Sequence, residues 1–584
     1  MTLRIAKTLL LLLFLLADFP NISTRVSSLG LSFSLLLYIG LYVPLAVGLF
    51  AAAFIPSPWI RLPLAVLLTA SSLVLLTYEA VTKGPFDYHG FETMLASAGA
   101  ATSAMAVYGN ILVRTVPVTL LLFVAILLPV RSNGLTLRHG LGAPVAALGL
   151  LSLMFYYRGG EGGRALPAPF APIAYTMLKG VTTLSDIGQV RRTVSIKPDN
   201  VPSDQDLVLI VDESIAPTYL DINNPDGVYS GLNRAPGNLA IHNFGYAASV
   251  SNCSAGTNNT LRFGGTRDNY RLAKRRYPSV WAYAHRAGFH TVYLDAQRVD
   301  GVLHNRMTEE EKGHVDEFVQ FGAFAVLDRD QALADELLAK LKNGRRDLIY
   351  INKLGAHFPV ADKFPDSMAR YQPILPRGHT ADIADMGSVH GDHDGSPEFW
   401  RLYRNAYRNT LLWNVGHFWD KIFANIGSAR PIIVYTSDHG QELHEDNWPG
   451  RTTHCIGNPR PQEGLVPIVV IDATDKPRTD WAHWAALNHN RTSHFRIYPT
   501  LLTLMGYKQS DIAPVYGPSL VEPASEPLMF NISYFAALGK KPDWRRIHLE
   551  DVPMPPHDGT GALAGARKPT GARNPTAKPQ IAAR

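Results

Sequence analysis

Cysteine is almost missing from this sequence: among 584 residues, only Cys253 and Cys455 are present. Two cysteines exclude a dense disulfide framework, and their count does not determine the compartment. Charged residues are also few, at 18%, and the basic excess is small, with 55 Lys and Arg against 49 Asp and Glu. An excess this small gives no extended basic surface, so we expect no nucleic-acid partner.

Apolar sequence is abundant, but it is concentrated at the amino-terminal end. A bilayer core about 30 Å thick requires about 20 apolar residues in a helix. A shorter run, Thr8–Ala17, has no small-residue cleavage site after it, so we count it as a span rather than a signal peptide. Four further stretches reach or approach the required length: Leu31–Ile55, Leu62–Val81, Ile111–Val130 and Leu141–Tyr157.

Five spans place the two ends of the chain on opposite sides of the membrane. Basic residues mark the cytoplasmic side, and Arg4 and Lys7 begin the chain there, with Arg61 and Arg138 in later connections on the same side. Everything after Arg158 is then expected outside the cytoplasm. This pattern predicts a multi-pass membrane protein with a domain outside the cytoplasm.

One charge lies inside a predicted span, where charge is costly. Arg114 is in the fourth apolar stretch, and we interpret it as a side chain near the span end that reaches water. The outer segment Tyr88–Leu95 is the alternative candidate for a contribution to a lipid head-group site.

The remainder of the chain alternates short apolar runs with helical patterns, which indicates an α/β domain with a mostly parallel sheet. The predicted strands are Leu207–Val211, His290–Leu294, Asp347–Ile351, Pro431–Tyr435 and Val466–Ile471. We therefore divide the chain into a transmembrane domain (1–158), a linker (159–205), a catalytic domain (206–550) and a disordered basic tail (551–584).

Polar residues follow two of these strands directly. Asp212, Glu213 and Ser214 follow the first, and Asp438 and His439 follow the strand at 431–435. Ligands in open α/β sheets bind beyond the carboxyl ends of the strands. Carboxylates and an imidazole meeting there suit Zn²⁺ or Mn²⁺.

The segment Ser251–Arg262 is rich in hydroxyl side chains and has a glycine directly before Thr257. Such a turn can present a hydroxyl at a helix N-terminus, where backbone N–H groups favour an anion and a nearby metal lowers the hydroxyl pKa. A simple helix N-cap at Thr257 or Ser254 is the plainer interpretation. His357 and His454 also follow strands and are suited to bind a phosphoryl oxygen or to protonate a leaving group.

In their order along the chain, these residues resemble the phosphoethanolamine transferases of the alkaline phosphatase and sulfatase superfamily, of which the lipid A-modifying enzymes are the best known. The most specific piece is Asp-His-Gly after an apolar strand. The matching pieces are Ile210–Ser214, Cys253–Arg262, Gly355–His357, Tyr407–Leu411, Thr436–Gly440, His454 and Val466–Val470.

The resemblance implies an α-helical membrane anchor in the bacterial inner membrane, followed by an α/β alkaline phosphatase/sulfatase-like domain in the periplasm. It implies that Thr257 takes up the phospho-group covalently and that His357 and His454 hold phosphate oxygens. It also implies a metal site, zinc with manganese as the alternative, whose ligands are Glu213, Thr257, Asp438 and His439.

The chain departs from that family at three points. Family members show Cys-Gly-Thr, so alignment on Gly-Thr selects Thr257 as the nucleophile, whereas alignment on Cys253 selects Ser254; we prefer Thr257. Asp212 replaces a glycine before the ligand Glu, which makes it a further candidate ligand. The bridging cysteines of lipid A transferases are missing, and Cys253 and Cys455 are either one bridge or two buried thiols.

The expected reaction moves phosphoethanolamine from phosphatidylethanolamine in the membrane to a glycan or glycolipid acceptor similar to lipid A. The alternatives are a phosphoglycerol transferase acting on a glucan and a sulfatase-like phosphodiesterase or hydrolase. The segment after Cys253 lacks the proline and arginine of a sulfatase motif, which disfavours a sulfatase.

Overall fold

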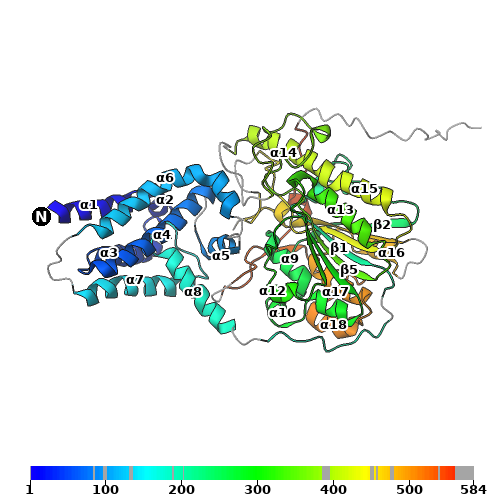
Figure 1. The fold of residues 1–584 in the computed structure, drawn as a ribbon, viewed down its shortest axis with the longest axis horizontal. Coiled ribbons are helices and arrows are strands. Elements are labelled where there is room, and N and C mark those ends of the chain that lie inside the picture. The colour runs from blue at the N-terminus through cyan, green and yellow to red at the C-terminus, as the bar shows by residue number, and fades with distance from the viewer. Residues whose placement is uncertain are drawn as a thin grey trace, which may run out of the picture.

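The computed structural model describes residues 2–82, 86–96, 101–129, 136–186, 190–200, 203–384, 395–447, 453–455, 458–473, 479–536 and 540–558. The chain forms a bundle of apolar helices at one end and an α/β domain at the other (Figure 1). The part of the predicted basic tail beyond residue 558 lies outside the described residues.

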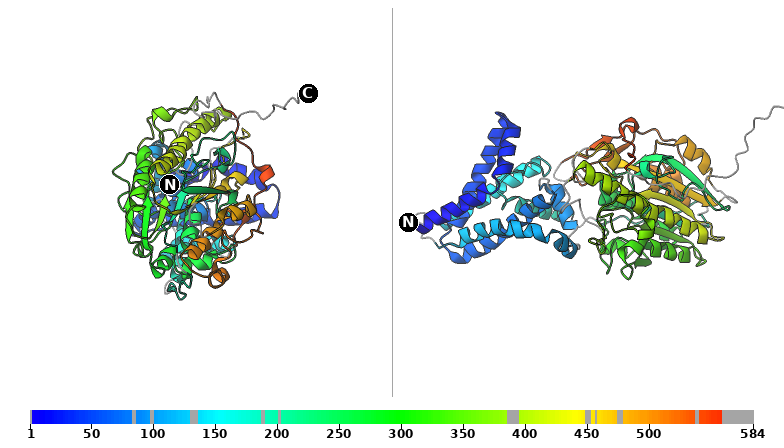
Figure 2. Two further views of the ribbon diagram at one scale, coloured as in Figure 1. Left: turned by 90° about the vertical axis from the view of Figure 1, so that its right-hand side faces the viewer. Right: turned by 90° about the horizontal axis from the view of Figure 1, so that it is seen from above.

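The amino-terminal part contains eight helices among the described residues. They are α1 (Thr2–Leu16), α2 (Phe19–Leu29), α3 (Phe33–Ala53), α4 (Pro58–Thr82), α5 (Tyr88–Ala96), α6 (Ala101–Leu127), α7 (Leu137–Tyr157) and α8 (Ala171–Asp186). Within α3, α4, α6 and α7, four stretches are long and apolar enough to cross a membrane, and α1 with α2 makes a fifth if a pair bent by 56° counts as one span. The prediction of a helical membrane anchor is therefore confirmed, with four spans or five, and α2 points away from the other helices (Figure 2).

The segment assigned to a linker contains α8, which packs against the membrane helices. Ala171, Ala174 and Tyr175 of α8 are buried in the same cluster as Leu122 of α6 and Phe155 of α7. The sequence of α8 mixes apolar and polar residues, so its apolar face was not recognised as part of a helical bundle.

The catalytic domain is built on a sheet of seven strands, in the order β2-β7-β6-β1-β5-β3-β4. All neighbouring pairs are parallel except the two that involve β7, which runs antiparallel between β2 and β6. The mostly parallel α/β fold is confirmed. The strands are β1 (Leu207–Asp212), β2 (Leu239–Ala248), β3 (His290–Asp295), β4 (Glu317–Gln320), β5 (Asp347–Asn352), β6 (Ile432–Ser437) and β7 (Leu465–Ala473), with a small separate pair formed by β8 (Met529–Asn531) and β9 (Trp544–Arg546).

Helices cover both faces of this sheet, so the side chains of β1 alternate between two cores. Val208 and Ile210 join one buried cluster, and Leu207 and Leu209 join the other, as the two-residue period of a strand requires. The helices are α9 (Ser254–Phe263), α10 (Tyr270–Arg276), α11 (Val280–Arg286), α12 (Glu309–Lys312), α13 (Arg329–Lys340), α14 (Pro397–Leu411), α15 (Phe418–Asn425), α16 (Trp481–Leu487), α17 (Ile497–Leu504) and α18 (Gln509–Tyr516).

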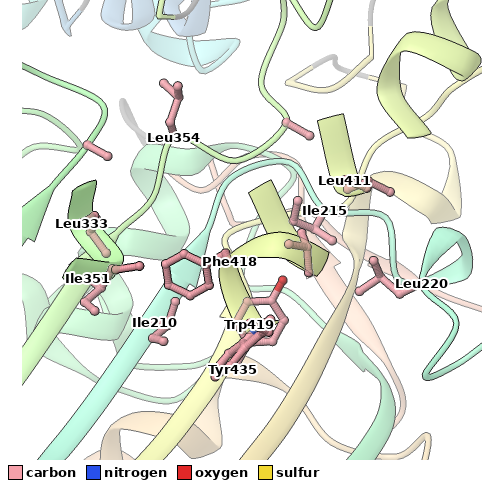
Figure 3. Packing of buried hydrophobic residues seen from close by; sticks show 14 of the residues in the cluster. Ile210, Ile215, Leu220, Leu333, Ile351, Leu354, Leu411, Phe418, Trp419 and Tyr435 are labelled. Carbon is pink, nitrogen blue, oxygen red and sulfur yellow. The ribbon is translucent and has the colours of Figure 1, made fainter. Parts of the chain in front are cut away.

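Figure 3 shows the first core, where Phe418 and Trp419 of α15 pack against Ile210 of β1 and Tyr435 of β6. This packing holds β1 and β6 firmly side by side, with Asp212 opposite Ser437 in the register. The residues that follow these two strands therefore emerge next to each other.

Candidate active site

A compact group of metal-ligand side chains lies at the carboxyl ends of β1 and β6. One ligand atom from each of Glu213, Asp438 and His439 lies within 4.8 Å of the others. All three residues are buried, with at most 1% of their surface exposed. The structure therefore brings together three of the four ligands expected from the sequence.

The chemistry of this group fits a divalent cation. Asp438 Oδ2 is buried and has no hydrogen-bond partner among the described residues. Burial and the nearby Glu213 charge raise the pKa of Asp438 to about 8, and the two carboxylates outweigh burial to raise the pKa of His439 to about 9. These groups hold protons that a bound cation would displace, and a set of two carboxylates and one imidazole suits zinc.

Neighbouring side chains orient Glu213. Its Oε1 accepts a hydrogen bond from the Ser214 hydroxyl at 2.9 Å, and its Oε2 accepts one from Gln297 Nε2 at 2.9 Å. Gln297 was not singled out in the sequence, although it comes two residues after the end of β3. The rule that selected Asp212 and Asp438, a polar residue just beyond a strand, would have included it.

Asp212 has a different environment. Its Oδ2 accepts hydrogen bonds from Lys353 Nζ at 2.7 Å and from the Tyr435 hydroxyl at 3.0 Å, and its Oδ1 accepts one from the backbone N–H of Glu213 at 3.0 Å. Both carboxylate oxygens are thus occupied, and Oδ2 belongs to a fully buried ion pair with Lys353. The geometry favours a structural role for Asp212 rather than the role of a ligand.

The hydroxyl-rich segment forms α9, which begins at Ser254. Ser254 Oγ lies 3.3 Å from Glu213 Oε1 and 3.2 Å from His439 Nε2. Thr257 is one turn further along, is fully buried, and its Oγ1 lies 3.5 Å from the carbonyl oxygen of Ser251. The structure therefore places the hydroxyl of Ser254, and not that of Thr257, against the ligand group.

Two further histidines complete the site. The ring of His454 stacks on that of His439, with centroids 4.4 Å apart, and the ring centroid of His357 is 5.1 Å from that of His454. His357 Nε2 also lies 4.0 Å from Glu213 Oε1. Both predicted phosphate-binding histidines thus lie beside the predicted metal ligands.

A disulfide joins Cys253 and Cys455, whose Cα atoms are 4.9 Å apart. One cysteine directly precedes Ser254 and the other directly follows His454. Of the two states left open by the sequence, the structure contains the bridge. It ties the start of α9 to the segment that carries His454.

Comparison with known proteins identifies the family to which the α/β domain is similar. Residues 214–507 match the Sulfatase family. The chain is 25% identical over 193 residues to Kdo(2)-lipid A phosphoethanolamine 7''-transferase of Salmonella typhimurium and 24% identical over 197 residues to the Escherichia coli protein of that name. Each alignment covers about 30% of this chain and about 30% of the length of the relative.

The fold of most of the chain is also shared with a solved membrane protein. Lipooligosaccharide phosphoethanolamine transferase A from Neisseria meningitidis superposes with a TM-score of 0.59 at 18% identity, covering 88% of this chain and 98% of that one. That likeness extends over both the helical bundle and the α/β domain. Because the family match spans half of the sequence and contains the site residues from Ser254 to His454, the chain belongs to the Sulfatase family.

Proposed function

We propose that this protein is a membrane-bound, metal-dependent phosphoethanolamine transferase whose nucleophile is Ser254. The observation that carries the proposal is the contact of Ser254 Oγ with Glu213 and His439 inside a buried group of cation ligands. The names of the relatives support phosphoethanolamine as the transferred group and a glycolipid similar to lipid A as the acceptor, and we take the donor to be a membrane phospholipid that has this head group, phosphatidylethanolamine. By the positive-inside rule, the site lies on the periplasmic side of the inner membrane.

In the first step, Ser254 Oγ attacks the phosphorus of the phospholipid phosphodiester. The bond from phosphorus to the diacylglycerol oxygen breaks, and the phosphoethanolamine group remains on the serine. The Ser254 hydroxyl proton passes to the carboxylate of Glu213, whose Oε1 lies 3.3 Å away, because the Nε2 lone pair of His439 would be taken up by the cation. A cation held by Glu213, Asp438 and His439 would supply positive charge to the developing phosphoryl oxygens.

His357 and His454 act on the phosphate side of the site. Both side chains are at most 9% exposed. His454 lies against His439, and His357 lies against His454 and near Glu213. In these positions an imidazole can donate a hydrogen bond to a phosphoryl oxygen or a proton to the leaving diacylglycerol. In the second step, an acceptor hydroxyl attacks the same phosphorus and restores the Ser254 hydroxyl. A membrane anchor suits this reaction because the donor is confined to the bilayer.

The test is mass spectrometry of the full-length protein after incubation with phosphatidylethanolamine. We expect a phosphoethanolamine adduct on Ser254, within the peptide that spans residues 251–262. The Ser254→Ala variant should lose the adduct and the transfer activity, whereas Thr257→Val should keep the adduct. An adduct on Thr257 that survives Ser254→Ala would contradict our choice of nucleophile and restore Thr257 as nucleophile and ligand.

A second donor separates the alternative reactions. An adduct formed only from phosphatidylglycerol would indicate a phosphoglycerol transferase. The absence of any adduct, together with release of free head group into water, would indicate a phosphodiesterase.

A further inference from the structure

A cavity of about 140 Å³ lies inside the membrane domain, at the bend between α1 and α2. Its walls come from the break between α1 and α2, from α3, α4 and α6, and from the segment at 165–168. That segment follows the end of α7 that faces the catalytic domain, and the Tyr38 hydroxyl donates a hydrogen bond to the carbonyl of Ala165 there. The cavity therefore opens in the half of the membrane domain nearest the catalytic domain.

Most of the lining is apolar, but two opposite charges line it as well: Asp18 and Arg114. Charges inside a membrane domain are costly and usually mark a functional pathway or site. The remaining lining residues include Phe14, Leu15, Ile22, Leu76, Val118 and Leu166, with the hydroxyls of Tyr42 and Thr115. This mixture matches a lipid, which has a charged head and an apolar body.

Neither charge is neutralised by an ion pair among the residues that the structure describes. Asp18 is the residue before α2, but its side chain makes no capping hydrogen bond to that helix. Its Oδ1 accepts only the short-range hydrogen bond from Asn21, at 2.6 Å. Arg114 is exposed, and within the described chain no hydrogen bond or ion pair of its guanidinium is found. The two charges line one cavity yet are more than 4 Å apart, so a ligand with both signs of charge could engage them together.

We infer that this cavity binds the head group of a zwitterionic aminophospholipid. The Arg114 guanidinium contacts the phosphate, since its planar donors match phosphate oxygens. The Asp18 carboxylate contacts the ammonium group, and the apolar walls contact the glycerol and the start of the acyl chains. The inference rests on the proposed function, because it supplies that reaction with a membrane site that holds donor lipid apart from the catalytic centre.

The experiment measures lipid retention and uses the full-length Ser254→Ala protein, in which lipid turnover is blocked. Delipidated protein in detergent is titrated with phosphatidylethanolamine or phosphatidylglycerol, and bound lipid is counted by native mass spectrometry. We expect Arg114→Gln to weaken retention of both lipids by about tenfold, because both have a phosphate. Asp18→Asn should weaken retention of phosphatidylethanolamine alone, because only that lipid has an ammonium group.

Two matched variants control for loss of charge at the same end of the membrane domain. Arg158→Gln and Glu161→Gln lie outside the cavity lining and should leave retention of both lipids unchanged. The inference is overturned if Asp18→Asn and Arg114→Gln retain phosphatidylethanolamine as the controls do, or if Asp18→Asn weakens both lipids equally. The experiment counts bound lipid and does not depend on turnover. Lipid binding can therefore be tested even if the proposed transfer reaction is wrong.

Discussion

At the residue scale, the catalytic centre concentrates negative charge where water is scarce. Glu213 and Asp438 are buried next to each other, and a bound cation would compensate their negative charge. We expect Asp438→Asn to reduce bound zinc to background in the purified protein, measured by elemental mass spectrometry. Glu442→Gln, a change at another buried acid of the same loop, should leave the zinc content unchanged. Equal zinc in wild type and Asp438→Asn would contradict the ligand assignment.

We expect His494 to make the folded domain less stable in acid. Burial lowers its pKa to about 3, and its Nε2 lies 2.8 Å from Thr436 Oγ1. Below the ordinary pKa of 6.5 the unfolded chain binds a proton that the folded chain does not, so stability falls as pH drops from 6.5 towards 3. By about pH 5 the loss should reach about 2 kcal/mol.

Thermal unfolding in detergent across this pH range checks that prediction. The His494→Gln variant has no titrating group at this position, so its unfolding temperature should depend less steeply on pH than that of the wild type. Parallel pH profiles for the two proteins would show that another group causes the acid sensitivity.

At the element scale, the placement of Ser254 depends on how α9 is anchored at its other end. Arg262 is fully buried, with Nε 2.6 Å from Glu311 Oε1 and Nη2 2.8 Å from the carbonyl of Asn305. Arg262→Met would leave Glu311 buried without a counter-charge, at a cost of about 3–5 kcal/mol. Arg267→Met breaks a pair with the half-exposed Glu526 and should cost less than about 1 kcal/mol. Chemical unfolding of both variants measures the difference, and similar losses would refute the anchoring role.

The elements that sequence reasoning located well were those with a simple pattern. The cores of β1 and β6 are continuous apolar runs, and their order along the chain was enough to place Glu213, Asp438 and His439 at one edge. β2 was missed because its partly exposed residues mix polar with apolar side chains. The direction of β7 could not be predicted, since a strand buried on both faces looks the same parallel or antiparallel.

The choice of Thr257 over Ser254 rested on alignment with the family's Gly-Thr, which carries no information on helix phase. Residues three apart in a helix lie on nearly the same face but one turn apart along the axis. Only the residue at which the helix starts determines which of Ser254 and Thr257 reaches the sheet edge, and helix boundaries are the least reliable part of a sequence-based assignment. The structure starts α9 at Ser254.

At the scale of the whole molecule, a buried carboxylate joins the membrane domain to the catalytic domain. Glu92 of α5 lies 2.7 Å from Arg306 of the catalytic domain and 2.8 Å from Lys179 of α8. Burial raises the pKa of Glu92, but the two cations outweigh burial and lower it overall. The Glu92 carboxylate is therefore charged at neutral pH. The contact ties α5 and α8 of the membrane domain to the catalytic domain.

Glu92→Gln should therefore impair transfer from a lipid donor more than turnover of a water-soluble phosphodiester. We expect roughly a tenfold loss on the lipid substrate, the change that about 1.4 kcal/mol of docking free energy produces. Glu161→Gln removes a more exposed bridge to Lys540 and serves as the control, with a loss within about twofold. An equal loss on both substrates would mean that Glu92 supports the fold rather than the docking.

The Cys253–Cys455 bridge also has a consequence for when the enzyme becomes active. Its partners are separated by 202 positions, so it cannot close until most of the catalytic domain has been synthesised. Disulfides persist only in oxidising compartments. With the catalytic domain on the proposed periplasmic side, the start of α9 and the His454 segment would be locked together late and only after export, so a newly made chain would acquire its complete catalytic centre only where the proposed substrates are.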